Sequence, residues 1–239
     1  MVSNVIGFLR FVGAVVVSLT FGLSSILVLP VNPGGKGFHA NSRVWAKVLL
    51  WICGVQVQAR GIEHIQSGQN YVYVANHASM FDIPAIVKGV PDQIRIVYKK
   101  ELERIPFFGW GLKWGSYIGI DRGRGPGAKR SLEEASQAIR NGASVLLYAE
   151  GTRTEDGKLQ PFKRGAFHLA VMAGVPVIPL TVNGSFNILR KHSVIVHPGK
   201  IDIILDAPIP VVTGNGKEAE FKLMENVRTA IERHYVEQS

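Results

Sequence analysis

The chain has 239 residues, a formal net charge of +9 and a sequence pI near 9.8, so we expect an anionic partner. A nucleic acid fits this expectation poorly, because no nucleic-acid-binding motif is present and 46% of the residues are hydrophobic. The only cysteine, Cys53, excludes an intramolecular disulfide and a cysteine-based zinc site. An anionic lipid surface or a phosphorylated substrate agrees best with this composition, whose mean hydropathy is +0.15.

The chain begins with an apolar segment that favours membrane attachment. Residues 11–29 form a mainly apolar run within a stretch that has no charge between Arg10 and Lys36. As a helix, this run would be about 28 Å long, close to the hydrocarbon thickness of a bilayer. A secretory signal peptide is the alternative, but no A-x-A-like cleavage site follows, so we expect the segment to be retained.

A second apolar segment, residues 44–57, suits a helix at the membrane interface better than a full span. It is short, carries a lysine and places Trp45 and Trp51 among valine and leucine residues. No acidic residue occurs in the first 62 positions, and this one-signed charge favours an anionic membrane surface. We therefore expect residues 1–60 to form membrane-associated helices and residues 61–239 to form the catalytic domain.

From residue 71 onward, strand-like and helix-like patterns alternate. This alternation predicts an α/β fold with a mostly parallel or mixed sheet flanked by helices. The expected strands are residues 71–75, 94–98, 116–120, 144–148, 176–182, 193–197 and 201–205. The expected helices are residues 129–140, 165–173 and 217–236. The basic, glycine-rich segment 123–130 lacks the G-K-[ST] of a P-loop, so we interpret it as a flexible loop.

A histidine and an aspartate follow the strand expected at residues 71–75. His77 comes directly after Asn76, and Asp82 lies five residues further on, at the start of a short expected helix. In open α/β sheets, ligands bind beyond the carboxyl ends of the strands. An aspartate there can orient a histidine, whose second ring nitrogen then takes a proton from a hydroxyl. Taken alone, the pattern leaves open that Asp82 only caps the helix. Ser79 lacks the G-x-S-x-G context of a nucleophile.

Three further segments follow this H-x4-D pattern in order. They read G-S-Y-I-G-I-D-R at residues 115–122, E-G-T-R-T at 150–154 and V-P-V-I-P-L at 175–180. Together with N-H-A-S-M-F-D at residues 76–82, they resemble the four sequence blocks of the glycerolipid acyltransferases, in particular the 1-acylglycerol-3-phosphate acyltransferases. The resemblance covers residues 71–180, and four ordered blocks rarely coincide by accident. The third block usually reads F-P-E-G-T-R, and Tyr148 and Ala149 replace its Phe-Pro here.

The resemblance also implies which residues bind the substrate. In the family, the second and third blocks bind the glycerol phosphate acceptor, and a guanidinium such as that of Arg122 or Arg153 can grip a phosphate with two hydrogen bonds. Gly151 would permit close approach of the backbone. Lys163 and Arg164 are weaker candidates. The expected substrate-binding residues are Lys100, Arg122, Glu150, Gly151, Thr152 and Arg153.

The reaction implied by the resemblance is transfer of an acyl chain from acyl-CoA or acyl carrier protein to the sn-2 hydroxyl of 1-acylglycerol 3-phosphate. The product is phosphatidic acid. His77 would be the general base and Asp82 its orienting partner, in a direct transfer without cofactor or metal. The expected partners are lysophosphatidic acid, the acyl donor and the membrane bilayer, and no nucleic acid is expected. The catalytic domain should lie on the cytoplasmic face of a membrane, such as a bacterial inner membrane.

Three alternatives stay open at the level of the sequence. The acceptor could be a different lysolipid. His77, Asp82 and Glu150 could be ligands in a metal-dependent phosphohydrolase, although such sites normally have more histidine or carboxylate ligands than these blocks offer. A basic, membrane-attached lipid-binding protein would explain the charge and the apolar N-terminus. It would leave the H-x4-D and E-G-T-R patterns without a role.

Overall fold

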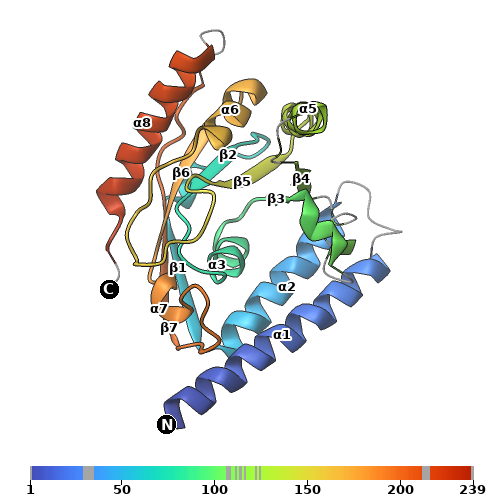
Figure 1. The fold of residues 1–239 in the computed structure, drawn as a ribbon, viewed down its shortest axis with the longest axis vertical. Helices are drawn as coiled ribbons and strands as arrows, with labels where there is room; N and C mark the ends of the chain where they lie inside the picture. The colour runs from blue at the N-terminus through green and yellow to red at the C-terminus, as the bar shows by residue number, and fades with distance from the viewer. Residues whose placement is uncertain are drawn as a thin grey trace.

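A sheet of seven strands occupies the centre of the computed structural model (Figure 1). This count covers the residues that the structure describes, which are 2–28, 35–105, 109–110, 112, 115, 117–121, 123, 125–211 and 216–237. The strands are β1 (Val55–Arg60), β2 (Val72–Ala75), β3 (Ile94–Lys99), β4 (Ile118–Ile120), β5 (Ser144–Tyr148), β6 (Val177–Asn183) and β7 (Gly199–Leu205). Their order is β1-β7-β6-β2-β5-β3-β4. β6 and β7 are antiparallel and the other neighbouring pairs are parallel, so the prediction of a mostly parallel or mixed sheet is confirmed.

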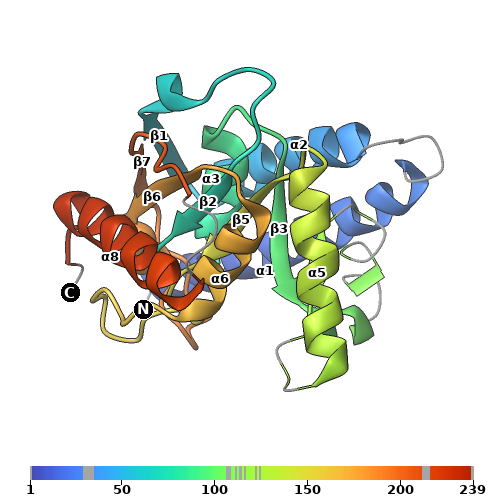
Figure 2. The ribbon, with the colours of Figure 1, turned by 90° about the horizontal axis from the view of Figure 1, so that it is seen from above.

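Helices cover both faces of this sheet. They are α1 (Val2–Val28), α2 (Lys36–Ile52), α3 (Asp82–Gly89), α5 (Pro126–Arg140), α6 (Arg164–Ala173), α7 (Ser185–Ile188) and α8 (Gly216–His234), with the short 3-10 helices η3 (Ile62–His64) and η4 (Lys100–Arg104). Helices α5, α6 and α8 lie on one face, and α2 and α3 lie on the other (Figure 2). Helix α1 packs along α2.

The central strand β2 and the residue before it show why both layers are required. Tyr71, Tyr73 and Ala75 belong to the core beneath α2 and α3, whereas Val72 and Val74 belong to the core beneath α5, α6 and α8. None of these five residues is more than 1% exposed. Successive side chains of a strand point to opposite faces, so a strand that is apolar at every position needs cover on both sides.

The segment 44–57 differs from its prediction because it is not one helix. Helix α2 ends at Ile52, and Gly54 then adopts a left-handed conformation with φ of 69°. Glycine enters this backbone region without strain, so the helix can end here. The residues from Val55 onward form β1, which pairs in parallel with β7. The domain boundary expected after residue 60 therefore lies after β1, although β1 is already part of the sheet.

Two smaller predictions are also wrong. Residues 193–197 are not a strand, because the Val196 amide donates to the carbonyl of Gly7 in α1 at 3.1 Å instead of to a strand of the sheet. The segment 123–130, expected to be a flexible loop, is helical from Pro126 onward. A proline suits the first position of a helix, because its φ is already helical and its missing N–H would have no partner there.

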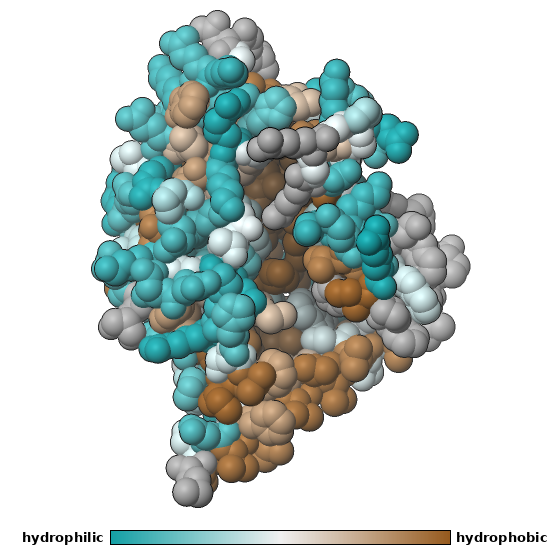
Figure 3. Space-filling view, in the orientation of Figure 1, coloured by the Kyte–Doolittle hydropathy of each residue, from teal (hydrophilic) through white to brown (hydrophobic). Residues whose placement is uncertain are grey.

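The two N-terminal helices lie side by side and antiparallel (Figure 1). Polar side chains join them, since the Asn41 amide donates to the Ser25 hydroxyl at 2.7 Å and the Trp45 indole to the Ser18 hydroxyl at 3.1 Å. Among the described residues, one helical segment, Val2–Ser25, is long and apolar enough to cross a membrane. Only 6% of its apolar window is buried, so most of its hydrophobic surface faces outward (Figure 3).

Candidate active site

Two of the sequence blocks leave the sheet side by side. The last residues of β2 and β5 lie opposite each other, so His77 and Glu150 follow at the same edge of two adjacent parallel strands. Asn76 fixes the end of β2, because its side-chain oxygen accepts from the Val182 amide at 2.7 Å and its nitrogen donates to the Val182 carbonyl at 2.9 Å. The carboxyl edge of the sheet therefore brings the H-x4-D and E-G-T-R blocks together, as ligand sites in such sheets require.

His77 and Asp82 form a hydrogen-bonded pair at this edge. His77 Nδ1 lies 2.6 Å from Asp82 Oδ2, which also accepts the amides of Ala78 at 2.9 Å and Ser79 at 3.0 Å. The Asp82 side chain is fully buried, and the His77 side chain is 16% exposed. Asp82 is the first residue of α3, but its carboxylate bonds the turn before the helix and the histidine. The pairing predicted from the spacing is present, and capping of α3 is not the role of this carboxylate.

These contacts determine which ring nitrogen of His77 can act as a base. Three donors converge on one carboxylate oxygen, so His77 Nδ1 must carry a hydrogen, and in the neutral imidazole the lone pair is then on Nε2. Over the described part of the chain, no protein group bonds to Nε2. The pair thus leaves one ring nitrogen of His77 available to a ligand, while the other is bound to the Asp82 carboxylate.

Ser79 is the hydroxyl closest in sequence to this base. Its side chain is 0% exposed, and its hydroxyl donates to the Leu189 carbonyl at 2.8 Å. A buried and engaged hydroxyl is not open to attack a thioester. We infer that Ser79 holds the H-x4-D turn against the segment that follows α7.

Glu150 is buried and binds backbone amides in both the H-x4-D loop and the E-G-T-R loop. Its Oε1 accepts the His77 amide at 2.6 Å and its Oε2 accepts the Gln160 amide at 2.8 Å, and the residue is 2% exposed. Burial raises the pKa of Glu150 to about 7, although the two amide hydrogen bonds act in the opposite direction. Because both oxygens are already engaged, we infer that Glu150 positions His77 and the loop. This role differs from the direct substrate contact expected from the sequence.

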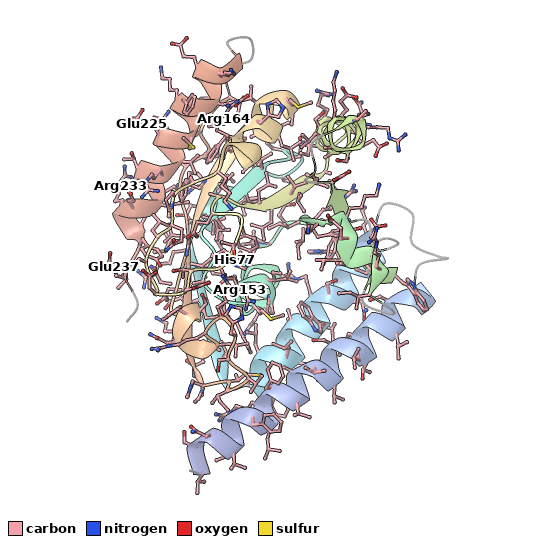
Figure 4. The ribbon with its side chains drawn as sticks, in the orientation of Figure 1. His77, Arg153, Arg164, Glu225, Arg233 and Glu237 are labelled. Atoms are coloured by element: carbon pink, nitrogen blue, oxygen red, sulfur yellow. The ribbon has the colours of Figure 1, made fainter. Side chains whose placement is uncertain are left out.

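The rest of the E-G-T-R loop offers a guanidinium. Gly151 has φ of 70°, and a side chain there would also lie 3.1 Å from the side chain of Lys163. Thr152 is exposed on the loop surface, and Arg153 is partly exposed. Within the described ranges, the Arg153 guanidinium has no hydrogen-bond or ion-pair partner. The amide of Thr154, the residue after Arg153, donates to the His77 carbonyl at 3.0 Å, and Figure 4 has Arg153 and His77 together in the middle of the view.

The other expected cations differ in their surroundings. Lys100 is exposed in η4, directly after β3, so it lies at the same edge of the sheet as His77. Arg122 lies outside the described residues. Arg164 bonds to the buried Glu220 at 2.8 Å and thereby ties α6 to α8. Arg164 is therefore a structural cation, and Lys163 beside Gly151 is the better placed of the two weaker candidates.

The surface of the molecule is hollowed in the region of His77 and Arg153 (Figure 3 and Figure 4). Figure 3 shows a depression with hydrophobic atoms in the middle of the view, and Figure 4, in the same orientation, has His77 and Arg153 in that region. An apolar hollow beside a base and a guanidinium suits a ligand that carries both an acyl chain and a phosphate. Among the described residues, no three histidine, cysteine or carboxylate side chains are close enough together to hold a metal ion.

Two contributors to the site were missed in the sequence. The backbone amide of Gln160 holds Glu150 from the far end of the loop, and nothing in a side-chain pattern marks such a contact. The Tyr148 ring stacks on the imidazole of His77, with ring centroids 3.8 Å apart. Tyr148 was visible only as a departure from the usual Phe-Pro before the E-G-T-R motif.

The buried carboxyl of Glu150 should make the stability of the protein depend on pH. Its pKa is about 7 in the folded protein against an ordinary value of 4.5, so between these values the folded state binds more protons than the unfolded state. The stabilisation that Glu150 contributes is therefore complete below its unfolded-state pKa and is lost as the pH rises through its folded-state pKa. We expect a loss of about 3 kcal/mol in the free energy of unfolding.

Glu150→Gln provides the comparison, because glutamine does not ionise. The unfolding free energy of wild type minus that of Glu150→Gln should fall by about 3 kcal/mol between about pH 4.5 and pH 7. Denaturant titrations at the two pH values measure this difference. A difference that stays constant would mean that the carboxyl has its ordinary pKa in the folded protein.

Known proteins resemble this chain over most of its length. A family model described as Acyltransferase matches residues 56–183, which is more than half of the chain. The chain is 30% identical over 208 residues to the 1-acyl-sn-glycerol-3-phosphate acyltransferase of Limnanthes douglasii, covering 84% of this chain and 72% of that protein. It is 29% identical over 205 residues to the protein of the same name from Cocos nucifera, and it spans 65% of that protein's length.

The fold agrees with a solved structure. The crystal structure of the 1-acyl-sn-glycerophosphate acyltransferase from Thermotoga maritima matches with a TM-score of 0.80 and 25% identity, covering 97% of this chain and 94% of that chain. The motifs at the carboxyl edge of the sheet, the family model and the relatives all lead to one assignment. The chain belongs to the acyltransferase family, in the group of the 1-acyl-sn-glycerol-3-phosphate acyltransferases.

Proposed function

We propose that this protein transfers an acyl chain from an acyl thioester to the sn-2 hydroxyl of 1-acylglycerol 3-phosphate, giving phosphatidic acid. The observation that carries the proposal is the His77–Asp82 pair near the guanidinium of Arg153 (Figure 4). Among the described residues, neither His77 Nε2 nor this guanidinium has a partner. The reaction named for its relatives supports the same acceptor. Acyl-CoA and acyl carrier protein both offer the thioester that the reaction needs.

The base and its carboxylate partner account for the proton transfers. His77 Nε2 takes the proton of the acceptor hydroxyl as the hydroxyl oxygen attacks the carbonyl carbon of the thioester. The tetrahedral oxyanion then collapses, the carbon–sulfur bond breaks, and the imidazolium gives its proton to the leaving thiolate. Between these steps the buried Asp82 carboxylate, held by two backbone amides, stabilises the imidazolium. General-base help of this kind contributes about 10²–10⁴ in rate.

The cations around the E-G-T-R loop serve the acceptor phosphate. Arg153 can bind two phosphate oxygens at once through its planar fork of N–H groups. Two lysines add positive charge near the E-G-T-R loop. The side chain of Lys163 lies over Gly151, and Lys100 is exposed at the same edge of the sheet. With the phosphate held there, the glycerol hydroxyl comes within reach of His77 and the acyl chain of the acceptor lies in the apolar hollow.

We further propose that the protein works at a membrane, with the catalytic domain on the cytoplasmic side. Helix α1 supports the attachment to a membrane, since Leu9 is 60% and Val16 is 55% exposed on a hydrophobic surface (Figure 3). The bonds from Asn41 and Trp45 keep α1 against α2, which favours attachment to one leaflet over a separate span. The lone Cys53 is buried and unpaired, as suits a reducing compartment.

Replacing the base should abolish most of the activity without unfolding the protein. We expect His77→Ala to lower kcat by about 10²–10⁴, because the imidazole is partly exposed and its loss removes the proton acceptor. Asp82→Asn should cost less, since an amide oxygen still accepts the Nδ1 proton while the charge that stabilises the imidazolium is lost. Kinetic assays with circular dichroism on each variant measure this. A near-normal kcat in His77→Ala would refute the mechanism.

Ser79→Ala is the matched control, because it removes a hydroxyl from the same turn and leaves the base in place. We expect most of kcat to remain and the free energy of unfolding to fall by about 1 kcal/mol through loss of the Leu189 bond. Loss of all transfer in a folded Ser79→Ala protein would point to a covalent acyl-serine instead.

Arg153→Ala should raise the acceptor KM by about ten- to 150-fold and leave the donor KM near its starting value, since a charge-assisted contact contributes about 1.5–3 kcal/mol. Arg153→Lys should recover little, because lysine keeps the charge but loses the planar fork. Arg233→Ala controls for net charge, as Arg233 is an exposed cation on α8 away from the hollow (Figure 4). A two-substrate kinetic matrix gives both constants. A rise in the donor KM alone would assign Arg153 to the donor's phosphates.

Charges on the outer face of α1 should weaken membrane binding while the fold persists. We expect a variant with Leu9→Asp and Val16→Asp to shift toward the unbound fraction in flotation with anionic liposomes, because aspartate is costly in hydrocarbon and repelled by anionic lipid. Val236→Asp, at a 61% exposed position near the C-terminus, is the control and should float like wild type. If the double variant floats fully, α1 is not the main attachment.

A further inference from the structure

Tyr148, the last residue of β5, covers one face of the His77 imidazole. The two ring centroids are 3.8 Å apart and the ring planes differ by 15°. Tyr148 is itself packed against the core cluster beneath α2 and α3. The imidazole therefore lies against a flat surface that the fold holds in place.

A single hydrogen bond does not fix an imidazole. The 2.6 Å contact between His77 Nδ1 and Asp82 Oδ2 sets the position of one ring atom. The ring can still rock through small changes of its χ1 and χ2 angles that keep Nδ1 near Oδ2, and such a swing moves Nε2 sideways. A flat partner in contact with one face blocks the swing toward that side. Proton transfer needs Nε2 within hydrogen-bond reach of the hydroxyl, so this freedom affects the chemistry.

The hydroxyl of Tyr148 takes no part in the contact with His77. Its oxygen is buried and has no hydrogen-bond partner among the described residues. Burial raises the pKa of Tyr148 well above its ordinary value, and the charge of Asp82 acts in the same direction. The phenol is therefore neutral under assay conditions, and the face of its ring is the part that meets the imidazole.

We propose that Tyr148 is a positioning residue for His77, which holds the imidazole in the plane set by Asp82 by stacking against its face. The proposal deepens the proposed function and rests on it, because position matters only if Nε2 receives the proton. A flat ring at residue 148 should be sufficient for this role. A side chain of similar bulk without a flat face should not be.

Tyr148→Phe and Tyr148→Leu separate the ring face from the hydroxyl and from apolar bulk. Phenylalanine keeps the stack, so its kcat should stay close to the wild-type value. Leucine keeps an apolar side chain without the stack, so its kcat should fall by about ten- to 100-fold while the acceptor KM stays nearly unchanged. Tyr148→Met serves in the same way if the leucine variant does not fold, as judged by circular dichroism. Equal loss in Tyr148→Phe would mean that the hydroxyl is responsible.

The same substitution in a protein without the base tests whether Tyr148 acts through His77. In the double variant His77→Ala/Tyr148→Leu, the second change should cost little beyond His77→Ala, because there is no imidazole left to position. A further ten- to 100-fold loss of residual turnover would show that Tyr148 acts independently of the histidine, and the proposal would then be wrong.

A spectroscopic readout makes the test independent of turnover. In protein with ¹⁵N-labelled histidine, the His77 nitrogens should show protonated Nδ1 and free Nε2 in wild type and in Tyr148→Phe. Tyr148→Leu should show exchange between ring states or loss of the Nδ1 proton signal. Wild-type nitrogen signals together with wild-type kcat in the leucine variant would overturn the proposal. A displaced imidazole with unchanged kcat would support the positioning role and instead refute His77 as the base.

Discussion

The hydrogen bond from the His77 amide to the Glu150 carboxylate connects the two loops on which the site depends. The loops leave adjacent parallel strands, and this 2.6 Å contact joins them directly beyond the sheet. The second oxygen of the same carboxylate binds the Gln160 amide and so closes the loop that carries Arg153. Because Glu150 is 2% exposed, water cannot readily replace these bonds. Glu150 thus helps to hold His77 and Arg153 relative to each other, together with the bond from the Thr154 amide to the His77 carbonyl at 3.0 Å.

Backbone amides, not arginine or lysine side chains, donate to both buried carboxylates of the site, and Asp82 Oδ1 has no hydrogen-bond partner among the described residues. Asp82 accepts two amides and the His77 ring proton, and Glu150 accepts two amides. These amide bonds favour the charged form of each carboxylate, although burial still raises the pKa of Glu150 to about 7. This arrangement leaves Arg153 without an acidic partner in the described part of the chain, so its charge is available for an anionic ligand. The surplus of positive charge along the whole chain then favours the approach of such a ligand.

Elements with a continuous apolar pattern could be predicted from the sequence, whereas contacts made by backbone groups could not. Residues 71–75 and 144–148 were predictable as buried strands, because they are apolar at nearly every position. Strand β1 was not, because it follows an apolar helix with only Gly54 to mark the change. The pairing of His77 with Asp82 followed from spacing and resemblance. The role of Glu150 could not be predicted in this way, because its partners are backbone amides, which a pattern of residue types does not mark.

Release of thiol from acyl-CoA and from acyl carrier protein tests direct, base-assisted transfer most directly. Purified protein would be assayed with and without lysophosphatidic acid, and with and without a metal chelator. The account predicts thiol release only when the acceptor is present, equimolar with phosphatidic acid and unchanged by the chelator. A burst of thiol without acceptor would reveal an acyl-enzyme, and chelator-sensitive release of inorganic phosphate would reveal a phosphohydrolase. Either result would contradict direct transfer to the acceptor with His77 as the base.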